Sequence, residues 1–108
     1  MWEYRATLNR IVDGDTVVLN IDLGFHITVT EKFRLSKINA PEMNTDEGKA
    51  AKAYLTSLLP TEAFALRAEV EGQDKYGRWL VSLSLPTNNH LNVNETMMTT
   101  GHAVAYSS

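Results

Sequence analysis

The sequence predicts a small α+β protein that is mainly β, with five short strands and two helices. Two observations carry this prediction. Apolar and polar residues alternate with a period of two in five stretches, which is typical of strands with one buried face. Between the third and fourth stretches, and again near the end of the sequence, the apolar spacing changes to that of a helix. We therefore expect one helix between strands three and four and a short C-terminal helix.

The first three strands are expected in the N-terminal third of the chain. The middle one is "TVVLNID", and "DLG" is expected to turn it into the third. The alternating apolar residues that predict the first and third strands are Tyr4, Ala6 and Leu8, then Phe25, Ile27, Val29, Phe33 and Leu35.

The segment "NTDEGKAAKAYLTSLL" has helical character. Asn44 is a candidate N-terminal cap with Glu47 three residues later, and Pro60 is expected to end the helix. One face of this helix is apolar, formed by Ala51, Tyr54, Leu55 and Leu58.

Two further strands and a short helix complete the order. In "NVNETMMTTG", Asn92 is a candidate helix cap and Gly101 a candidate stop. The alternating apolar residues of the two strands are Phe64, Leu66, Ala68 and Val70, then Trp79, Val81, Leu83 and Leu85. Trp79 is either part of the barrel packing or a platform for a base, and packing is the expected role.

Composition limits the classes of function. We expect one domain over residues 1–108, and a net charge of −3 argues against a protein that coats nucleic acid. The absence of cysteine excludes a disulfide framework and a thiol nucleophile. No N-terminal stretch is apolar enough for a signal peptide or membrane span, so we expect a cytoplasmic protein with no membrane partner.

Three segments hold more charge than a strand or turn requires: "VDGDTV", "FRLSKINAPEM" and "DKYGRWL". Oxygen donors without thiolates or clustered imidazoles select a hard cation such as Ca²⁺ or Mg²⁺. Two arginines beside such a cation suit a phosphate, and a free carboxylate could activate water. The candidate donors are Asp13, Asp15, Asn39 and Glu42, and the arginines are Arg34 and Arg78.

Each segment alone also has an ordinary interpretation. "DGD" is a common turn sequence, and "NAPEM" can be a loop that leads into a helix. "DKYGR" can be a surface hairpin in which Gly77 turns the chain and Arg78 is solvated. The three segments in this order make these interpretations much weaker together than singly.

The segments "IVDGDTVVL", "FRLSKINAPE", "DKYGRWLVSL" and "NVNETMMTTGHAVAY" resemble the staphylococcal nuclease (thermonuclease) family from about Leu8 to Tyr106. This resemblance implies a five-stranded OB-fold barrel with a helix between strands three and four. Periodicity alone predicts only an α+β fold or a small barrel, and the resemblance favours the barrel.

The resemblance also implies a metal site. Asp15 would ligate Ca²⁺, Asn39 would occupy the second ligand position, and the backbone carbonyl of Ala40 would add an oxygen. Asp13 resembles an acid that supports the metal ligands from behind. Because the family usually has aspartate where Asn39 stands, we expect weaker metal binding, with Mg²⁺ or Mn²⁺ as alternatives to Ca²⁺.

The remaining roles implied by the resemblance concern the substrate. Glu42 matches the general base that positions water, while Arg34 and Arg78 match the pair that grips the scissile phosphate. Further contacts are implied for Lys75 and Tyr76, with a neighbouring phosphate, and for Tyr106, with a base.

The leading hypothesis is a metal-dependent nuclease that hydrolyses DNA, RNA or both. The alternatives are a catalytically weakened barrel that binds nucleic acid or protein, and a plain single-strand-binding barrel, which the acidic net charge disfavours. We expect a monomer or a weak homodimer.

Overall fold

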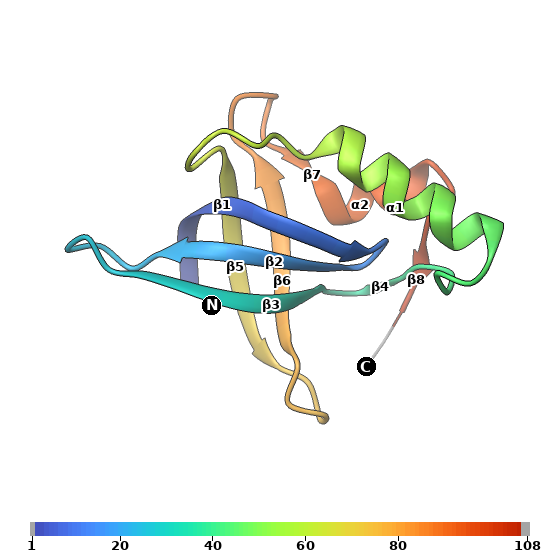
Figure 1. The fold of residues 1–108 in the computed structure, drawn as a ribbon, viewed down its shortest axis with the longest axis horizontal. Helices are drawn as coiled ribbons and strands as arrows, with labels where there is room; N and C mark the ends of the chain where they lie inside the picture. Colours follow the sequence, from blue (N-terminus) through green and yellow to red (C-terminus); the bar gives the residue numbers. More distant parts are fainter. Residues whose placement is uncertain (1, 107–108) are drawn as a thin grey trace.

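A computed structural model describes residues 2–106 and contains a mainly β fold with two helices (Figure 1). In chain order the elements are β1 (Trp2–Asp13), β2 (Thr16–Asp22), β3 (Thr28–Leu35), β4 (Ile38–Asn39), α1 (Asp46–Leu58), β5 (Leu66–Gln73), β6 (Trp79–Leu85), β7 (Leu91–Asn92), α2 (Val93–Thr99) and β8 (Val104–Ala105).

The five long strands form a closed barrel. Their order is β3-β2-β1-β5-β6, with antiparallel neighbours, and a parallel pairing of β3 with β6 closes the ring. This pairing joins Phe33 with Trp79, Arg34 with Leu80 and Leu35 with Val81. The predicted OB-like barrel is therefore confirmed, and α1 lies between β3 and β5 in the chain, as expected.

The apolar periodicity of the strands supplies the core. Alternate residues of the barrel strands point inward, and the two helices add Leu55, Val93 and Met97, all fully buried. Large-to-small changes at such positions typically cost about 2–5 kcal/mol. This packed interior gives the site a fixed frame.

The segment "VDGDTV" is a turn between two strands, so the ordinary interpretation of "DGD" describes its backbone correctly. β1 ends at Asp13 and β2 begins at Thr16. A Cβ on Gly14 would lie 2.8 Å from the Cβ atoms of both Ala40 and Ala51. Glycine is therefore needed here because the turn packs directly against α1 and the segment after β4.

The expected third strand begins too early. β3 starts at Thr28, while Phe25 and His26 form the tip of a hairpin with φ values of 54° and 63°. Leu23 and Ile27 pair across this tip, because the Leu23 N–H donates to the Ile27 carbonyl over 2.9 Å. Alternation of Phe25 and Ile27 misled the prediction because Phe25, 94% exposed, faces solvent rather than the core.

The predicted cap of the first helix is wrong by one residue. Thr45, with φ −111° and ψ 158°, is the N-cap of α1, and its hydroxyl accepts a hydrogen bond from the Gly48 N–H over 3.0 Å. Asn44 and Thr45 are both good capping residues, so sequence alone did not separate them. The cap predicted for α2 is confirmed, since the Asn92 side chain accepts from the Glu95 N–H over 2.9 Å.

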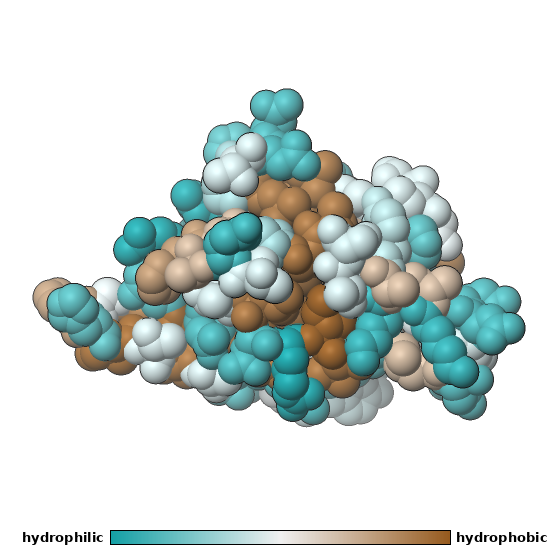
Figure 2. Space-filling view, turned by 45° about the horizontal axis from the view of Figure 1, so that its top comes forward, coloured by the Kyte–Doolittle hydropathy of each residue, from teal (hydrophilic) through white to brown (hydrophobic). Residues whose placement is uncertain are grey.

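Hydrophobic residues are also exposed on the surface. Figure 2 shows them in a band through the middle of one face and again near the β2–β3 hairpin at the left. Neither helix of the described residues is long and apolar enough to cross a membrane.

Candidate catalytic cleft

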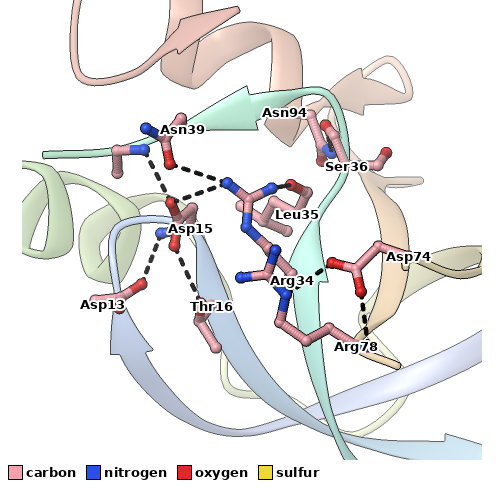
Figure 3. A network of polar contacts seen from close by, with 11 residues as sticks. Asp13, Asp15, Thr16, Arg34, Leu35, Ser36, Asn39, Asp74, Arg78 and Asn94 are labelled. Carbon is pink, nitrogen blue, oxygen red and sulfur yellow. Dashed lines mark hydrogen bonds and ion pairs between the residues drawn. The ribbon is translucent and has the colours of Figure 1, made fainter. Parts of the chain in front are cut away.

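Asp15 lies in the β1–β2 turn, directly before β2, where this turn meets the end of β3 and the segment after β4 (Figure 3). Its carboxylate accepts hydrogen bonds from the Thr16 hydroxyl over 3.0 Å and from the Ala40 N–H over 2.9 Å. Its own N–H donates to an Asp13 carboxylate oxygen over 3.1 Å. The backbone adds a bond from the Leu35 N–H to the Asp15 carbonyl over 2.7 Å. These contacts fix a buried carboxylate.

The environment of Asp15 disfavours its negative charge. Burial raises the pKa of Asp15, and the neighbouring Asp13 raises it further, while the hydrogen bonds from Ala40 and Thr16 act in the opposite direction. The nearest guanidinium nitrogen, from Arg34, is 3.7 Å away. A cation beside the two carboxylates would offset this cost.

Arg34 lies in the wall of the barrel, with a side chain only 7% exposed. Its guanidinium donates to Asn39 Oδ1 over 3.0 Å and to the Leu35 carbonyl over 3.4 Å. The ring of Tyr106 lies 4.8 Å from its Cζ atom, a cation–π distance. Arg34 is therefore fixed on several sides.

Arg78 lies just before β6, on the β5–β6 hairpin, with a side chain 48% exposed. Its Nε donates to Asp74 Oδ2 over 2.7 Å. The other oxygen of Asp74 accepts from the backbone N–H groups of Tyr76 and Arg78, each over 2.9 Å. Gly77, with φ 79°, turns the chain as predicted.

Asp74 is a residue that sequence reasoning missed. Although partial burial works to raise it, the pKa of Asp74 is lowered, because the N–H groups of Arg78 and Tyr76 and the Arg78 guanidinium stabilise the carboxylate. Asp74 thus shapes the hairpin and also aims Arg78.

The two arginines share one cavity. It has a volume of about 280 Å³, and its wall combines residues of β2, β3 and the β5–β6 hairpin: Thr16, Glu31, Lys32, Arg34, Gly77, Arg78 and Trp79. The parallel pairing of β3 with β6 brings together these residues, which lie far apart in the sequence. We call this cavity the arginine cleft.

Glu42 lies after β4 with an exposed side chain. The Thr45 hydroxyl and N–H donate to its carbonyl over 2.6 and 3.0 Å. A Cβ on Gly48 would lie only 1.8 Å from the same carbonyl oxygen, so any other residue there would displace this backbone. The fold fixes the backbone of Glu42 and leaves its side chain free of hydrogen bonds among the described residues.

The other predicted site residues fall into two groups. Asn39 is exposed and bonded to Arg34, so it joins the cluster of Asp13, Asp15 and the Ala40 backbone. Lys75 and Tyr76 lie on the exposed hairpin, where both the Lys75 ammonium and the Arg78 guanidinium lie 5.4 Å from the Tyr76 ring. Within residues 2–106 no three acidic, histidine or cysteine side chains gather as a metal cluster.

Asn94 is a second residue that the sequence did not reveal. It is buried on α2, and its amide donates to the carbonyls of Ser36 and Val81 over 3.0 and 3.1 Å. Its Oδ1 accepts from the Leu83 N–H over 3.1 Å. These bonds tie α2 to β6 and to the turn after β3, which separates Arg34 from Asn39.

Two comparisons with known proteins bear on this site. The family model of staphylococcal nuclease homologues matches residues 32–108. The chain is also 32% identical, over 116 aligned residues, to a protein named Endonuclease YhcR from Bacillus subtilis (strain 168). The alignment covers 96% of this chain but only 9% of that relative.

Proposed function

Because the chain belongs to the staphylococcal nuclease family, we propose that it is a nuclease that hydrolyses phosphodiester bonds of DNA, RNA or both with a bound Ca²⁺ ion. One observation carries the proposal. The buried Arg34 and the hairpin residue Arg78 line the same cleft, while Arg34 lies 3.7 Å from the buried carboxylate of Asp15. Fixed guanidinium groups beside an acidic cluster suit a phosphodiester held next to a cation.

The residues present fit a hard cation. The candidate ligands around Asp15 are all oxygens, the type that hard cations prefer, and burial beside Asp13 raises the pKa of Asp15. Asp15, Asn39 and the Ala40 carbonyl would hold the ion, with Asp13 orienting Asp15 through its backbone N–H. When bound, Ca²⁺ supplies positive charge next to a phosphoryl oxygen and lowers the pKa of a coordinated water.

The arginines would bind the scissile phosphate. Arg34 is already oriented by Asn39, Leu35 and Tyr106, so little rearrangement is needed when negative charge grows on the phosphoryl oxygens. Arg78 would contact the same phosphate from the β5–β6 hairpin, across the cleft from Arg34. Preorganised donors of this kind typically contribute on the order of 10²–10³ in rate each.

Glu42 would accept the proton of the attacking water. Its side chain is exposed and its backbone is fixed against Gly48, which leaves the carboxylate free to meet a substrate. Lys75 and Tyr76 would contact a neighbouring phosphate from the hairpin. Tyr106, whose ring lies 4.8 Å from the Arg34 Cζ, would pack against a base.

The test is incubation of the protein with DNA and with RNA, in Ca²⁺ and in EDTA. We expect cleavage in Ca²⁺, its loss in EDTA, and a steep loss in Glu42→Ala. Glu47→Ala is the matched control, because Glu47 is an exposed acid in the first turn of α1. Full activity in EDTA would refute the metal-assisted mechanism, and absence of cleavage under all conditions would favour a barrel that only binds.

A further inference from the structure

The end of the barrel next to the arginine cleft is open and apolar. A cavity of about 350 Å³ lies there, which we call the barrel mouth. Residues from β1, β2, β3, β5 and β6 and the start of the β2–β3 loop line it: Trp2, Tyr4, Ile21, Leu23, Val29, Glu31, Phe33, Val70 and Trp79. Both tryptophans of the chain are among them.

These tryptophans are not buried as core residues would be. Trp2 is 64% exposed and Trp79 is 36% exposed. The expected role of Trp79 is packing in the barrel, but more than a third of the residue remains exposed. Exposed aromatic rings around a cavity are typical of binding surfaces, because leaving large apolar groups in water is unfavourable.

The barrel mouth adjoins the arginine cleft. Glu31 and Trp79 line both cavities. Trp79 follows Arg78 in the chain and pairs with Phe33 across the parallel closure. A nucleic-acid strand whose phosphate lies between the arginines can therefore place an adjacent base at Trp79.

We propose that the barrel mouth is a base-binding subsite, in which unpaired bases beside the scissile phosphate stack on Trp79 and Trp2. This proposal rests on the proposed nuclease function. Among the described residues of the lining Glu31 is the only charged one and it is acidic, so a phosphate is disfavoured there and an uncharged group is favoured. Bases meet both conditions, because their faces stack on aromatic rings and their edges carry N–H donors for a carboxylate.

The chain offers a direct probe of this subsite. Both tryptophans line the barrel mouth, and Trp2 does not line the arginine cleft, so the fluorescence change that is lost in Trp2→Ala reports on the barrel mouth. We expect saturable quenching when a short oligothymidylate is added to Glu42→Gln in Ca²⁺. Introducing Trp2→Ala in the same background should weaken binding roughly 10- to 100-fold, the usual loss for one stacked base. Phe25→Ala is the matched control, because Phe25 is 94% exposed but does not line the cavity.

Cleavage assays separate this inference from the proposed function. With the otherwise unchanged chain, Trp2→Ala should raise KM for oligothymidylate and leave cleavage of an abasic strand of the same length, which has no aromatic ring, unchanged. Trp79→Phe, which retains an aromatic ring, should raise KM for oligothymidylate less than Trp79→Ala does. If oligothymidylate is cleaved but neither quenches fluorescence nor distinguishes Trp2→Ala, the subsite is refuted and the nuclease function stands.

Two other outcomes are also decisive. If nothing is cleaved but quenching and its loss in Trp2→Ala persist, the base-binding subsite holds and the nuclease function is refuted. If fluorescence responds to protein concentration instead of oligothymidylate, and sedimentation detects a dimer, the barrel mouth binds a second copy of the chain and the proposal is overturned.

Discussion

Arg34 lies inside the barrel wall with a side chain 7% exposed, whereas Arg78 lies on a hairpin with a side chain 48% exposed. Arg34 contacts Asn39, Leu35, Asp15 and Tyr106, and these partners come from several segments. Arg78 depends on Asp74, four residues earlier in the same hairpin. Arg34 is therefore held by contacts across the tertiary structure, whereas Arg78 is oriented by contacts within a single hairpin.

The largest expected effect tests this difference directly. Arg34→Lys and Arg78→Lys should each lower kcat/KM on the order of 10²–10³, because an ammonium lacks the bidentate fork. Only Arg34→Lys should also lower the melting temperature, since buried acceptors lose their partner at a cost of about 1–3 kcal/mol. Nuclease kinetics and thermal unfolding check this, with the exposed Arg10→Lys as the control. Equal melting temperatures for both variants would contradict the view that Arg34, but not Arg78, contributes to the stability of the fold.

The next prediction concerns the charge of Asp15. Burial and the neighbouring Asp13 raise the pKa of Asp15 above its ordinary value of 3.8, so folding disfavours the ionised carboxylate. The free energy of unfolding therefore falls as the pH rises from 3.8 through the raised pKa of the folded protein. At neutral pH in EDTA, Asp15→Asn should therefore unfold at the same temperature as the parent or higher. Ca²⁺ at a hundred times its Kd should stabilise the parent by about 2.7 kcal/mol and the variant hardly at all.

Thermal unfolding of both proteins in EDTA and in Ca²⁺ measures this. Asp22→Asn is a suitable control, because Asp22 lies at the far end of β2 and pairs with Arg5 over 3.0 Å. The metal assignment would fail if Asp15→Asn responded to Ca²⁺ as the parent does.

The hairpin half of the cleft can be tested through Asp74. Asp74→Ala should lower kcat/KM roughly tenfold, because Arg78 loses the group that orients it, and adding the change to Arg78→Ala should cost little more. Because the pKa of Asp74 is lowered, its contribution to stability is present above the unfolded value near 3.9 and is lost as pH falls below it. Parent and Asp74→Asn should therefore converge in stability in acid. Additive effects of the two alanine changes would mean that Asp74 acts on something other than Arg78.

The smallest expected effect is at Asn39. Replacing it with aspartate adds a charged oxygen beside Asp15, so Ca²⁺ should bind several-fold more tightly. Cleavage at limiting Ca²⁺ should rise, and the gain should shrink at saturation. Calorimetric titration decides the matter. Unchanged or weaker binding would show that Asn39 is not a metal ligand. Its role would then be to orient Arg34, whose guanidinium donates a hydrogen bond to Asn39 Oδ1 over 3.0 Å.

Much of the fold could be predicted because it depends on local periodicity. Alternation predicted the core faces of the five long strands, and Asn92 was identified as a cap. The errors arose where two local signals competed, as at Asn44 and Thr45, or where alternation continued into a solvent-exposed tip, as at Phe25. Hydrophobicity alone does not reveal which side of a hairpin faces water.

The site was less predictable because its organisation is tertiary. The sequence could pair Arg34 with Arg78, but not show that one is buried and the other exposed. Nothing in the sequence distinguishes Asp74 from other residues of the predicted hairpin, or Asn94 from other polar residues of the predicted short helix. Their importance depends on hydrogen bonds to Arg78 and to the carbonyls of Ser36 and Val81, which only the folded arrangement specifies.

The parallel pairing of β3 with β6 also has a consequence for the order of events in folding. The hairpins β1–β2, β2–β3 and β5–β6 join neighbouring strands through short connections, whereas the pairings of β1 with β5 and of β3 with β6 join strands that are distant in the sequence. Distant contacts carry the larger loop-closure entropy, so we expect them to form late. Arg34 belongs to β3 and Arg78 directly precedes β6. In a chain that has formed only its hairpins, the two arginines would not yet lie side by side and the cleft would be absent. We therefore expect catalytic activity to appear only when the barrel closes.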